Sequence, residues 1–411
     1  MSSRHSEITN AQLKTNTMSI LSDRINNLST SQTLAMAALA RELKAQGKDI
    51  ISLSLGEPDF NTPDFIKEAA KKAIDENYST YSPVDGYMEL KEAICRKFKR
   101  DNNLDYKPAN IVVSTGAKQS LYNIAQVMLN DGDEVILPAP YWVSYFEIIK
   151  LSGGIPVEVP TSVETDFKIT PEQLEKAITS KTKMMWFSSP CNPSGSVYNR
   201  DELTAIGKIL EKHPNIYIVS DEIYEHINFS GTFCSIGSIP GLFERTITVN
   251  GVAKAFAMTG WRIGYIGAPE FIAKACTKMQ GQVTSGANSI AQRATITAVD
   301  ADPKVLNEMV AAFKNRRDLV VGLTATIPGL KLNVPEGAFY IFPDVSSFFG
   351  KTLRGKLINN ADDFSMYLLS EANVATVTGD AFGNPSCIRI SYATSEELLT
   401  EAFNRIKEAL S

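Results

Sequence analysis

The chain has 411 residues, a formal net charge of −5 and a hydrophobic fraction of 44%. This length suggests two or three domains, and the hydrophobic fraction is sufficient for sizeable cores. A chain without a basic surplus is not suited to binding nucleic acid, and no apolar run approaches the roughly 20 residues that cross a bilayer. The five cysteines are scattered and form no CxxC pair, which speaks against a disulfide framework or a zinc site and is typical of a cytoplasmic protein.

The N-terminal 60 residues contain the first predicted elements. Residues 1–17 are polar, and they lack both the apolar stretch of a secretory signal and the arginine-rich, acid-poor composition of a mitochondrial presequence. We interpret them as a disordered tail, and we expect the ordered chain to begin at Met18. Further on, Ile50–Leu55 is predicted to be a strand that leads into the sequence GEPDF.

The middle of the chain alternates short apolar runs with segments of helical spacing. Ala117, Leu121 and Ile124 recur on one face of a predicted helix, and Pro171 begins a second helix. This alternation predicts an α/β fold with a mostly parallel, seven-stranded sheet that helices cover on both faces. The predicted strands are Ile111–Ser114, Glu134–Leu137, Pro156–Val159, Lys183–Ser188, Ile216–Ser220, Thr246–Val249 and Arg262–Gly267.

The pattern changes after Asp300. Apolar residues keep a helical period from Val305 to Val321, which predicts a long helix that connects two domains. We expect a smaller α+β domain built from residues 18–60 and 305–411, beside a larger domain of residues 61–304. The further elements predicted in this region are Gly337–Phe342, Ala361–Glu371, Cys387–Ser391 and Glu396–Leu410.

Parallel sheets bind ligands at the carboxyl ends of their strands, so the residues that follow each predicted strand are candidate site residues. The segment Thr115-Gly116-Ala117-Lys118 follows the first strand and opens a helix, whose free N–H groups would suit a phosphate. It is not a P-loop, because the pattern G-x-x-x-x-G-K-[ST] is absent. A tight turn before a helix is the simpler explanation of this segment taken alone.

Polar residues also follow the strands that end at Ser188, Ser220 and Val249. A turn or a helix cap would explain any one of these polar residues, but not their recurrence at successive strand ends. A lysine among small apolar residues, as in VAKAFA, is rarely buried without a partner. The four residues are Asn192, Asp221, Tyr224 and Lys254, and Arg262 follows the lysine by eight positions.

This set of side chains fits one cofactor chemically. A lysine can form a Schiff base with an aldehyde, and an aspartate beside a pyridine nitrogen keeps that nitrogen protonated. A tyrosine and an asparagine can hydrogen-bond a phenolate oxygen, while an arginine and a helix N-terminus can hold a phosphate. Together these groups describe a site for pyridoxal 5'-phosphate (PLP), whose protonated ring accepts electrons from carbanions. No metal is expected, because a histidine-based metal site or catalytic triad would have to rely on His226.

The chain resembles the fold-type I aminotransferases that use PLP, and it is most similar to the bacterial branch that contains many aspartate and prephenate aminotransferases. The resemblance extends from about Arg24 to the C-terminus. One departure is Gly251, where some relatives have a hydroxyl residue that touches the phosphate. The motifs that carry the resemblance are Gly56-Glu57-Pro58-Asp59-Phe60, Tyr81 with Gly86, Gly116-Ala117-Lys118-Gln119, Tyr141-Trp142, Asn192-Pro193-x-Gly195, Asp221-x-x-Tyr224, Lys254 with Arg262, and Arg389-Ile390-Ser391.

The resemblance implies roles in catalysis and cofactor binding. Lys254 would hold the cofactor as a Schiff base and shuttle a proton, and Asp221 would pair with the ring nitrogen. Tyr224 and Asn192 would contact the phenolate oxygen. Tyr81 would reach the phosphate of the neighbouring subunit, which implies a homodimer. The other cofactor-binding residues implied are Gly116, Ala117, Lys118, Trp142 and Arg262.

The resemblance also implies that seven residues bind the substrate: Ser31, Thr33, Gly56, Lys118, Trp142, Asn192 and Arg389. Arg389 would clamp the α-carboxylate. Lys118, Ser31 and Thr33 would bind an acidic side chain. A helix N-cap is the alternative explanation for Ser31 and Thr33, and a position on a helix surface is the alternative for Lys118.

The expected activity is aspartate:2-oxoglutarate transamination by a ping-pong mechanism, with amino acids and 2-oxo acids as substrates. The alternatives within the same fold are a prephenate or aromatic aminotransferase and a PLP-dependent C–S (β-) lyase, since nothing in the sequence excludes a leaving group on Cβ. A non-catalytic relative, such as a transcriptional regulator, is disfavoured because Lys254 is intact.

Overall fold

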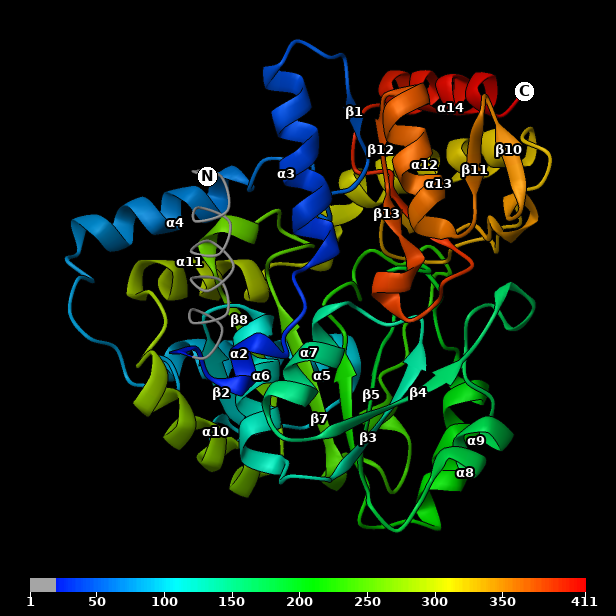
Figure 1. Cartoon of the computed structure of the whole chain (residues 1–411). Helices are drawn as coiled ribbons and strands as arrows, with labels where there is room; N and C mark the ends of the chain where they lie inside the picture. Colours follow the sequence, from blue (N-terminus) through cyan, green and yellow to red (C-terminus); the bar gives the residue numbers. More distant parts are fainter. Residues whose placement is uncertain (1–19) are drawn as a thin grey trace, which may run out of the picture.

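The computed structural model describes residues 20–411, so the predicted tail of residues 1–17 and the predicted start at Met18 lie outside the described residues. A seven-stranded sheet with the order β2-β8-β7-β6-β5-β3-β4 forms the centre of the fold (Figure 1). Its strands are β2 (Ile111–Ser114), β3 (Glu134–Ala139), β4 (Ile155–Pro160), β5 (Thr182–Ser188), β6 (Tyr217–Asp221), β7 (Thr246–Gly251) and β8 (Gly264–Gly267). Neighbouring strands pair in parallel except at β8, which is antiparallel to both β2 and β7. The predicted α/β fold with a mostly parallel seven-stranded sheet is therefore confirmed.

Helices cover this sheet on both faces. Alternate side chains of the central strands accordingly lie in two different hydrophobic cores, one on each face. Met184 and Trp186 of β5 pack in one core with side chains of α6, α7 and α10. Met185 and Phe187 of the same strand pack in another core with side chains of α8 and α9. A continuous apolar run is what a strand buried on both faces requires. The covering helices are α5 (Met88–Asn102), α6 (Ala117–Met128), α7 (Ser144–Leu151), α8 (Pro171–Ala177), α9 (Arg200–Glu211) and α10 (Glu270–Val283). Outside them, α11 (Ser289–Asp300) packs on α5, and α4 (Asp64–Asp75) packs on α11.

The two ends of the chain meet in the remaining part of the structure. Strand β1 (Ile51–Ser52) pairs in parallel with β12 (Val374–Ala375), and Ala40 of α3 packs against Leu369 and Ala375. Strands β13, β14 and β9 form an antiparallel sheet. The elements of this region are α2 (Asp23–Asn26), α3 (Gln32–Ala45), α12 (Asn307–Ala325), β9 (Tyr340–Ile341), β10 (Lys351–Leu353), β11 (Lys356–Ile358), α13 (Ala361–Tyr367), β13 (Val377–Thr378), β14 (Ile388–Ser391) and α14 (Glu396–Leu410). The division into residues 18–60 with 305–411 and residues 61–304 stays a prediction.

Several predicted boundaries differ from the structure. The predicted strand Arg262–Gly267 is wrong at its start, because a 3-10 turn ends at Trp261 and Arg262 has a φ of 59°. The predicted strand Gly337–Phe342 contracts to Tyr340–Ile341, since only these residues pair with β14. In each case, the apolar residues of the segment are buried as expected, but Arg262 is exposed, and hydrophobicity did not determine which backbone groups have a strand partner.

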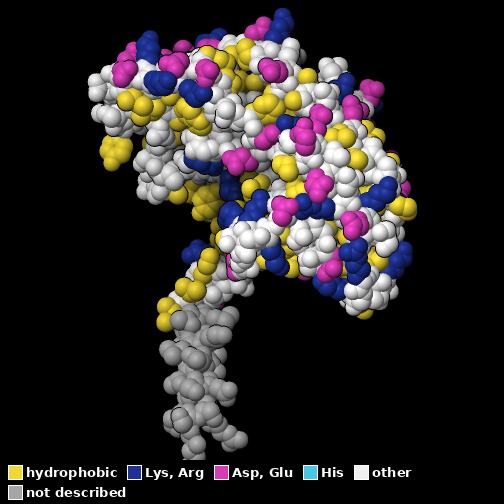
Figure 2. All heavy atoms as spheres, turned by 90° about the horizontal axis from the view of Figure 1, so that it is seen from above, with side chains coloured by type: hydrophobic (Ala, Val, Ile, Leu, Met, Phe, Trp, Pro, Cys, Tyr) yellow, Lys and Arg dark blue, Asp and Glu magenta, His cyan; other side chains and the backbone are white. Residues whose placement is uncertain are grey.

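The face seen from above shows acidic, basic and hydrophobic side chains interspersed (Figure 2). Among the described residues, no helix combines the length and the apolar character needed to cross a bilayer. The five cysteines are all free, as their scattered positions predicted.

Candidate active site

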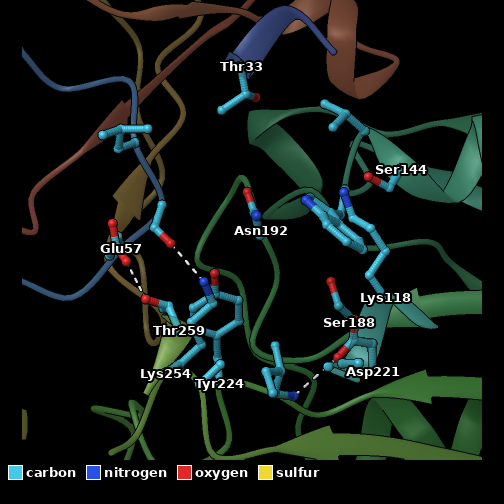
Figure 3. Close-up of a pocket in the computed structure, with 18 of the residues that line it drawn as sticks. Thr33, Glu57, Lys118, Ser144, Ser188, Asn192, Asp221, Tyr224, Lys254 and Thr259 are labelled. Carbon is cyan, nitrogen blue, oxygen red and sulfur yellow. Dashed lines mark hydrogen bonds between the residues drawn. The ribbon is translucent and has the colours of Figure 1, made fainter. Parts of the chain in front are cut away.

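A cavity of about 410 Å³ lies at the carboxyl ends of the central parallel strands. Most of the predicted site residues line it, although they come from both ends and the middle of the chain (Figure 3). Tyr81 does not line this cavity, and its side chain is 99% exposed. The predicted residues that do line it are Ser31, Thr33, Gly56, Gly116, Ala117, Lys118, Trp142, Asn192, Asp221, Tyr224, Lys254, Arg262 and Arg389.

Lys254 stands on the turn that follows β7, and its Nζ points into the cavity. Nζ donates a hydrogen bond of 2.7 Å to the carbonyl oxygen of Gly56 (Figure 3). Burial lowers the pKa of Lys254 to about 8, although Glu57 acts in the opposite direction. A substantial fraction of the amine is therefore neutral near physiological pH, as a nucleophile or a proton acceptor requires.

Asp221 ends β6, where its pairing with Ser188 of β5 and Val249 of β7 directs it to the base of the cavity. The Tyr145 hydroxyl donates a hydrogen bond of 2.7 Å to Oδ2, and the backbone N–H of Ile223 donates one of 3.2 Å to Oδ1. Burial raises the pKa of Asp221 to about 6, while these two hydrogen bonds oppose the shift. A buried carboxylate of this kind would be stabilised by a cationic partner.

Two further predicted residues meet on the opposite side of the cavity. The guanidinium of Arg389 donates hydrogen bonds to Asn192 Oδ1 at 3.1 Å and to the carbonyl oxygen of Ser54 at 2.6 Å. Arg389 is only 2% exposed, yet among the described groups none accepts a hydrogen bond from its Nε. A buried charge with an unpaired donor suits an incoming carboxylate, because leaving that donor unpaired is unfavourable.

The turn before α6 forms a cradle suited to an anion. Gly116 has a φ of +84° and precedes the first turn of α6, where helix geometry leaves backbone N–H groups without helical partners. A Cβ at Gly116 would overlap Nη2 of Arg262, and one at Gly264 would overlap the backbone nitrogen of Ala117. Glycine at both positions therefore allows the arginine and the helix N-terminus to approach each other closely. These residues fit a phosphate.

Lys118 follows this cradle and faces an aromatic wall. Its Nζ lies 4.9 Å from the centre of the Trp142 ring. Burial and the nearby Arg262 lower the pKa of Lys118. Lys118 is exposed overall, and its side chain also lines the cavity beside Trp142.

Ser31 and Thr33 approach the cavity from the start of α3. Ser31 is the N-cap residue of this helix, but its side chain makes no capping hydrogen bond. The Oγ1 atom of Thr33 is buried and has no partner among the described residues. The structure therefore provides no side-chain cap from Ser31, and it leaves the buried Thr33 hydroxyl without a hydrogen-bond partner among the described residues.

Several residues that line the cavity were not predicted from the sequence, among them Tyr145, Ser188 and Tyr340. Tyr145 lies three positions after the predicted Trp142, and Ser188 is the last residue of a predicted strand, so both carried a positional signal. Tyr340 carried none, since it lies inside an apolar run. His226 lies outside this cavity and beside Asp101 and Glu225.

Comparison with known proteins identifies the family. The sequence model of the class I and II aminotransferases matches residues 48–406. The chain belongs to this family. Aminotransferases of this kind are in general PLP enzymes, and the predicted resemblance is confirmed.

Individual aminotransferases match over nearly the whole chain. An aspartate/prephenate aminotransferase from Cereibacter sphaeroides is 50% identical, covering 95% of this chain and 98% of the relative. The crystal structure of the aspartate aminotransferase from Rhizobium meliloti has a TM-score of 0.92 at 44% identity, covering 95% and 98% of the two chains. The aspartate aminotransferase of Thermus thermophilus, solved with maleate, has a TM-score of 0.89 at 41% identity, covering 95% and 99%.

Proposed function

We propose that this protein is a PLP-dependent aspartate:2-oxoglutarate aminotransferase that works by a ping-pong mechanism. The observation that carries the proposal is the meeting of three features in one cavity. These are the Lys254 amine with a pKa of about 8, the buried carboxylate of Asp221, and the buried guanidinium of Arg389 with its unpaired Nε.

The residues of the cavity fit PLP on the criteria of shape and charge. Arg262 and the N-terminus of α6 at Gly116 and Ala117 would hold its phosphate, and Trp142 would stack on its ring. Asp221 would hold a proton on the ring nitrogen, whose cationic form would compensate the burial of the carboxylate. When bound, the cofactor supplies an electron sink for the electron pair released at the substrate Cα.

The chain itself would supply the groups that bind and move protons. Lys254 Nζ would attach the cofactor covalently and, once substrate has displaced it, take the proton from Cα, since its lowered pKa gives it a larger neutral fraction than an ordinary lysine has. Tyr224 and Asn192 would hydrogen-bond the phenolate oxygen of the cofactor. Arg389 would bind the α-carboxylate, because Asn192 Oδ1 at 3.1 Å and the Ser54 carbonyl oxygen at 2.6 Å fix the orientation of its guanidinium. Gly56 lines the same cavity.

We assign the recognition of an acidic substrate side chain to Lys118, Ser31 and Thr33. Lys118 supplies a positive charge at the cavity, and the buried Thr33 Oγ1 lacks a partner among the described residues. A relative solved with maleate, a dicarboxylate, supports an acidic substrate. Prephenate is the second candidate amino acceptor, because the 50% identical relative is named an aspartate/prephenate aminotransferase.

We also propose a homodimer in which Tyr81 contacts the cofactor phosphate of the partner. Tyr81 is 99% exposed and lies outside the cavity of its own chain. Ile20, Leu21 and Ile25 are at least half exposed as well, and burial against a second copy would remove this apolar surface from water. Sedimentation analysis would test the dimer, and Tyr81→Phe is expected to weaken cofactor binding.

We further propose a small domain of residues 18–60 and 305–411, and a cytoplasmic location.

An absorption experiment tests the main proposal. The purified protein with PLP is expected to show a visible band, which fades when aspartate is added and returns when 2-oxoglutarate is added. Return of the band with prephenate as the acceptor would extend the activity to the second candidate. Absence of the band, or a band that aspartate leaves unchanged, would contradict the proposed function.

A further inference from the structure

A tyrosine that none of the motifs includes stands at the centre of the site. Tyr340 of β9 is fully buried, at 0% exposure, and it lines the cavity. Its hydroxyl lies 2.8 Å from the hydroxyl of Tyr224, and both groups are buried. The two hydroxyls form one hydrogen bond, in which either oxygen can be the donor.

The ring of Tyr340 has a second neighbour on the substrate side of the cavity. The guanidinium carbon of Arg389 lies 4.7 Å from the centre of this ring, within the range of a cation–π interaction. Phe382 contributes a second ring at 4.9 Å. The aromatic face of Tyr340 thus limits where the Arg389 guanidinium can move, while Asn192 and Ser54 hold its nitrogen atoms.

The hydroxyl of Tyr340 also explains why residue 56 is a glycine. A Cβ at Gly56 would overlap this hydroxyl, and the next ring atom would be 3.3 Å away. The carbonyl oxygen of Gly56 accepts the hydrogen bond from Lys254 Nζ. Tyr340 therefore lies against the backbone that holds the lysine, as well as against Tyr224 and Arg389.

We propose that Tyr340 is a positioning residue that couples the cofactor-binding half of the site to the carboxylate-binding half. Its hydroxyl orients Tyr224, its ring orients Arg389, and its contact with Gly56 sets the distance between these halves. This inference rests on the proposed function.

The direction of the hydrogen bond follows from the number of protons available. A phenol has one proton to donate. If Tyr224 donates that proton to the phenolate oxygen of the cofactor, the proton shared with Tyr340 must come from Tyr340. A chain of two hydroxyls is polarised along its length, so the Tyr340 donor strengthens the hydrogen bond that Tyr224 gives. The stronger hydrogen bond stabilises the negative charge on the phenolate oxygen of the bound cofactor, and so favours the deprotonated form of the cofactor in the pH titration.

The first test is the pH titration of the visible band of the holoenzyme. Tyr340→Phe keeps the ring beside Arg389 and removes the hydroxyl, so the midpoint of the titration is expected to rise by roughly half a pH unit. Tyr392→Phe is the matched control, because Tyr392 is equally buried and its hydroxyl donates to the carbonyl oxygen of Ala338, outside the cavity lining. This control should leave the midpoint unchanged. Equal midpoints in Tyr340→Phe and the wild type would overturn the proposal.

The second test measures coupling through Gly56 by the binding of maleate to the holoenzyme in calorimetry. Gly56→Ala is expected to weaken maleate binding about tenfold or more, because the new methyl group meets the Tyr340 oxygen. The double variant Gly56→Ala with Tyr340→Phe lacks that oxygen, and it should recover at least about a third of the binding free energy that Gly56→Ala loses. A double variant as weak as Gly56→Ala, or weaker, would overturn the proposed contact.

The wild type separates the two levels of the argument. A wild-type protein without a visible band, or one that does not bind maleate, would remove the proposed function itself. A wild type that behaves as expected, with variants that show neither the midpoint shift nor the rescue, would remove only the role of Tyr340.

Discussion

Replacing the buried carboxylate of Asp221 by an amide is expected to stabilise the cofactor-free protein while it abolishes transamination. Asp221 is 5% exposed, and burial raises its pKa from 3.8 to about 6. The difference of about 2 pKa units means that ionisation of Asp221 destabilises the native state by about 3 kcal/mol at neutral pH. Asp221→Asn has nearly the same shape and carries no charge, so it avoids this loss.

The stability gained by Asp221→Asn is reduced, because the asparagine side chain cannot keep both hydrogen bonds of the carboxylate unchanged. Asparagine can still accept from the Ile223 N–H through its oxygen, but its NH2 group would face the Tyr145 hydroxyl, which must rotate to accept. The net pKa shift already includes the hydrogen bonds to the charged carboxylate, so the remaining loss is the reorientation of the Tyr145 hydroxyl, which costs about 1 kcal/mol. The expected net increase in the free energy of unfolding is therefore about 2 kcal/mol.

Urea unfolding of the cofactor-free protein at two pH values measures this effect. Because the native-state pKa of Asp221 is raised, the wild-type protein takes up a proton on folding as the pH falls from about 6 towards 3.8. Acidification therefore stabilises the wild type relative to the variant, and the advantage of Asp221→Asn should be full above about pH 7 and should disappear near pH 4. A variant no more stable than the wild type at neutral pH, or an advantage that acidification leaves unchanged, would refute the reasoning.

Glu225→Gln is the matched control for this experiment. Glu225 is also 5% exposed, and burial alone would raise its pKa, but the ion pair with Lys97 and the nearby His226 hold it below the usual value. Removing this charge leaves Lys97 without its closest partner, so the variant is expected to lose about 3 kcal/mol or more. The two carboxyl-to-amide changes should thus alter stability in opposite directions.

Four further outcomes follow from the same site. Lys254→Ala should abolish transamination without changing the circular dichroism spectrum, and an active variant would exclude the proposed mechanism. In the wild type, the rate of cofactor capture should rise with pH up to about 8 and then level off, because only the neutral amine attacks; stopped-flow absorption would detect a flat profile, which is incompatible with this pKa. Arg389→Lys keeps the positive charge but loses the planar guanidinium, so steady-state kinetics should show a KM for aspartate that is raised about 100-fold. An unchanged KM would mean that Arg389 does not bind the substrate. Gly116→Ala should weaken cofactor binding at least about tenfold in equilibrium dialysis, because its φ is +84° and its Cβ would overlap Arg262. Gly132→Ala is the control, since Gly132 has a φ of +88° but a Cβ there would meet no atom within 4 Å, and this variant should leave cofactor binding unchanged. Equal losses in both variants would rule out the overlap as the cause.

The parts of the fold that the sequence predicted well are those in which hydrophobic pattern and burial coincide. The run Met184-Met185-Trp186-Phe187 is buried on both sides, so its lack of alternation correctly predicted a covered strand. Short strands were predicted less well. Only Ile51–Ser52 of the predicted strand Ile50–Leu55 pairs with β12, because pairing depends on where the partner strand lies and not on the local apolar pattern.

The candidate site divides in the same way. Asn192, Asp221 and Lys254 were predictable, because each lies at or just beyond the end of a strand, and the carboxyl ends of neighbouring parallel strands lie together. Tyr340 was not, since it lies inside an apolar run and its hydroxyl partner Tyr224 is 116 positions away in the chain. Tyr145 lies near the predicted Trp142, but its hydrogen bond to Asp221 spans 76 positions and no local pattern indicates it.

The sequence by itself determined the alternation of strands and helices, the polar residues at the strand ends and the motifs of the aminotransferase family. These properties are local, because a short window of residues contains both the periodicity and the turn that produce them. Only the tertiary structure decided that Arg389 donates to the Ser54 carbonyl across 335 positions of the chain, and that Tyr340 contacts both Tyr224 and the position of Gly56. Such contacts depend on how complete elements pack, and no local pattern of residues encodes the distance between them.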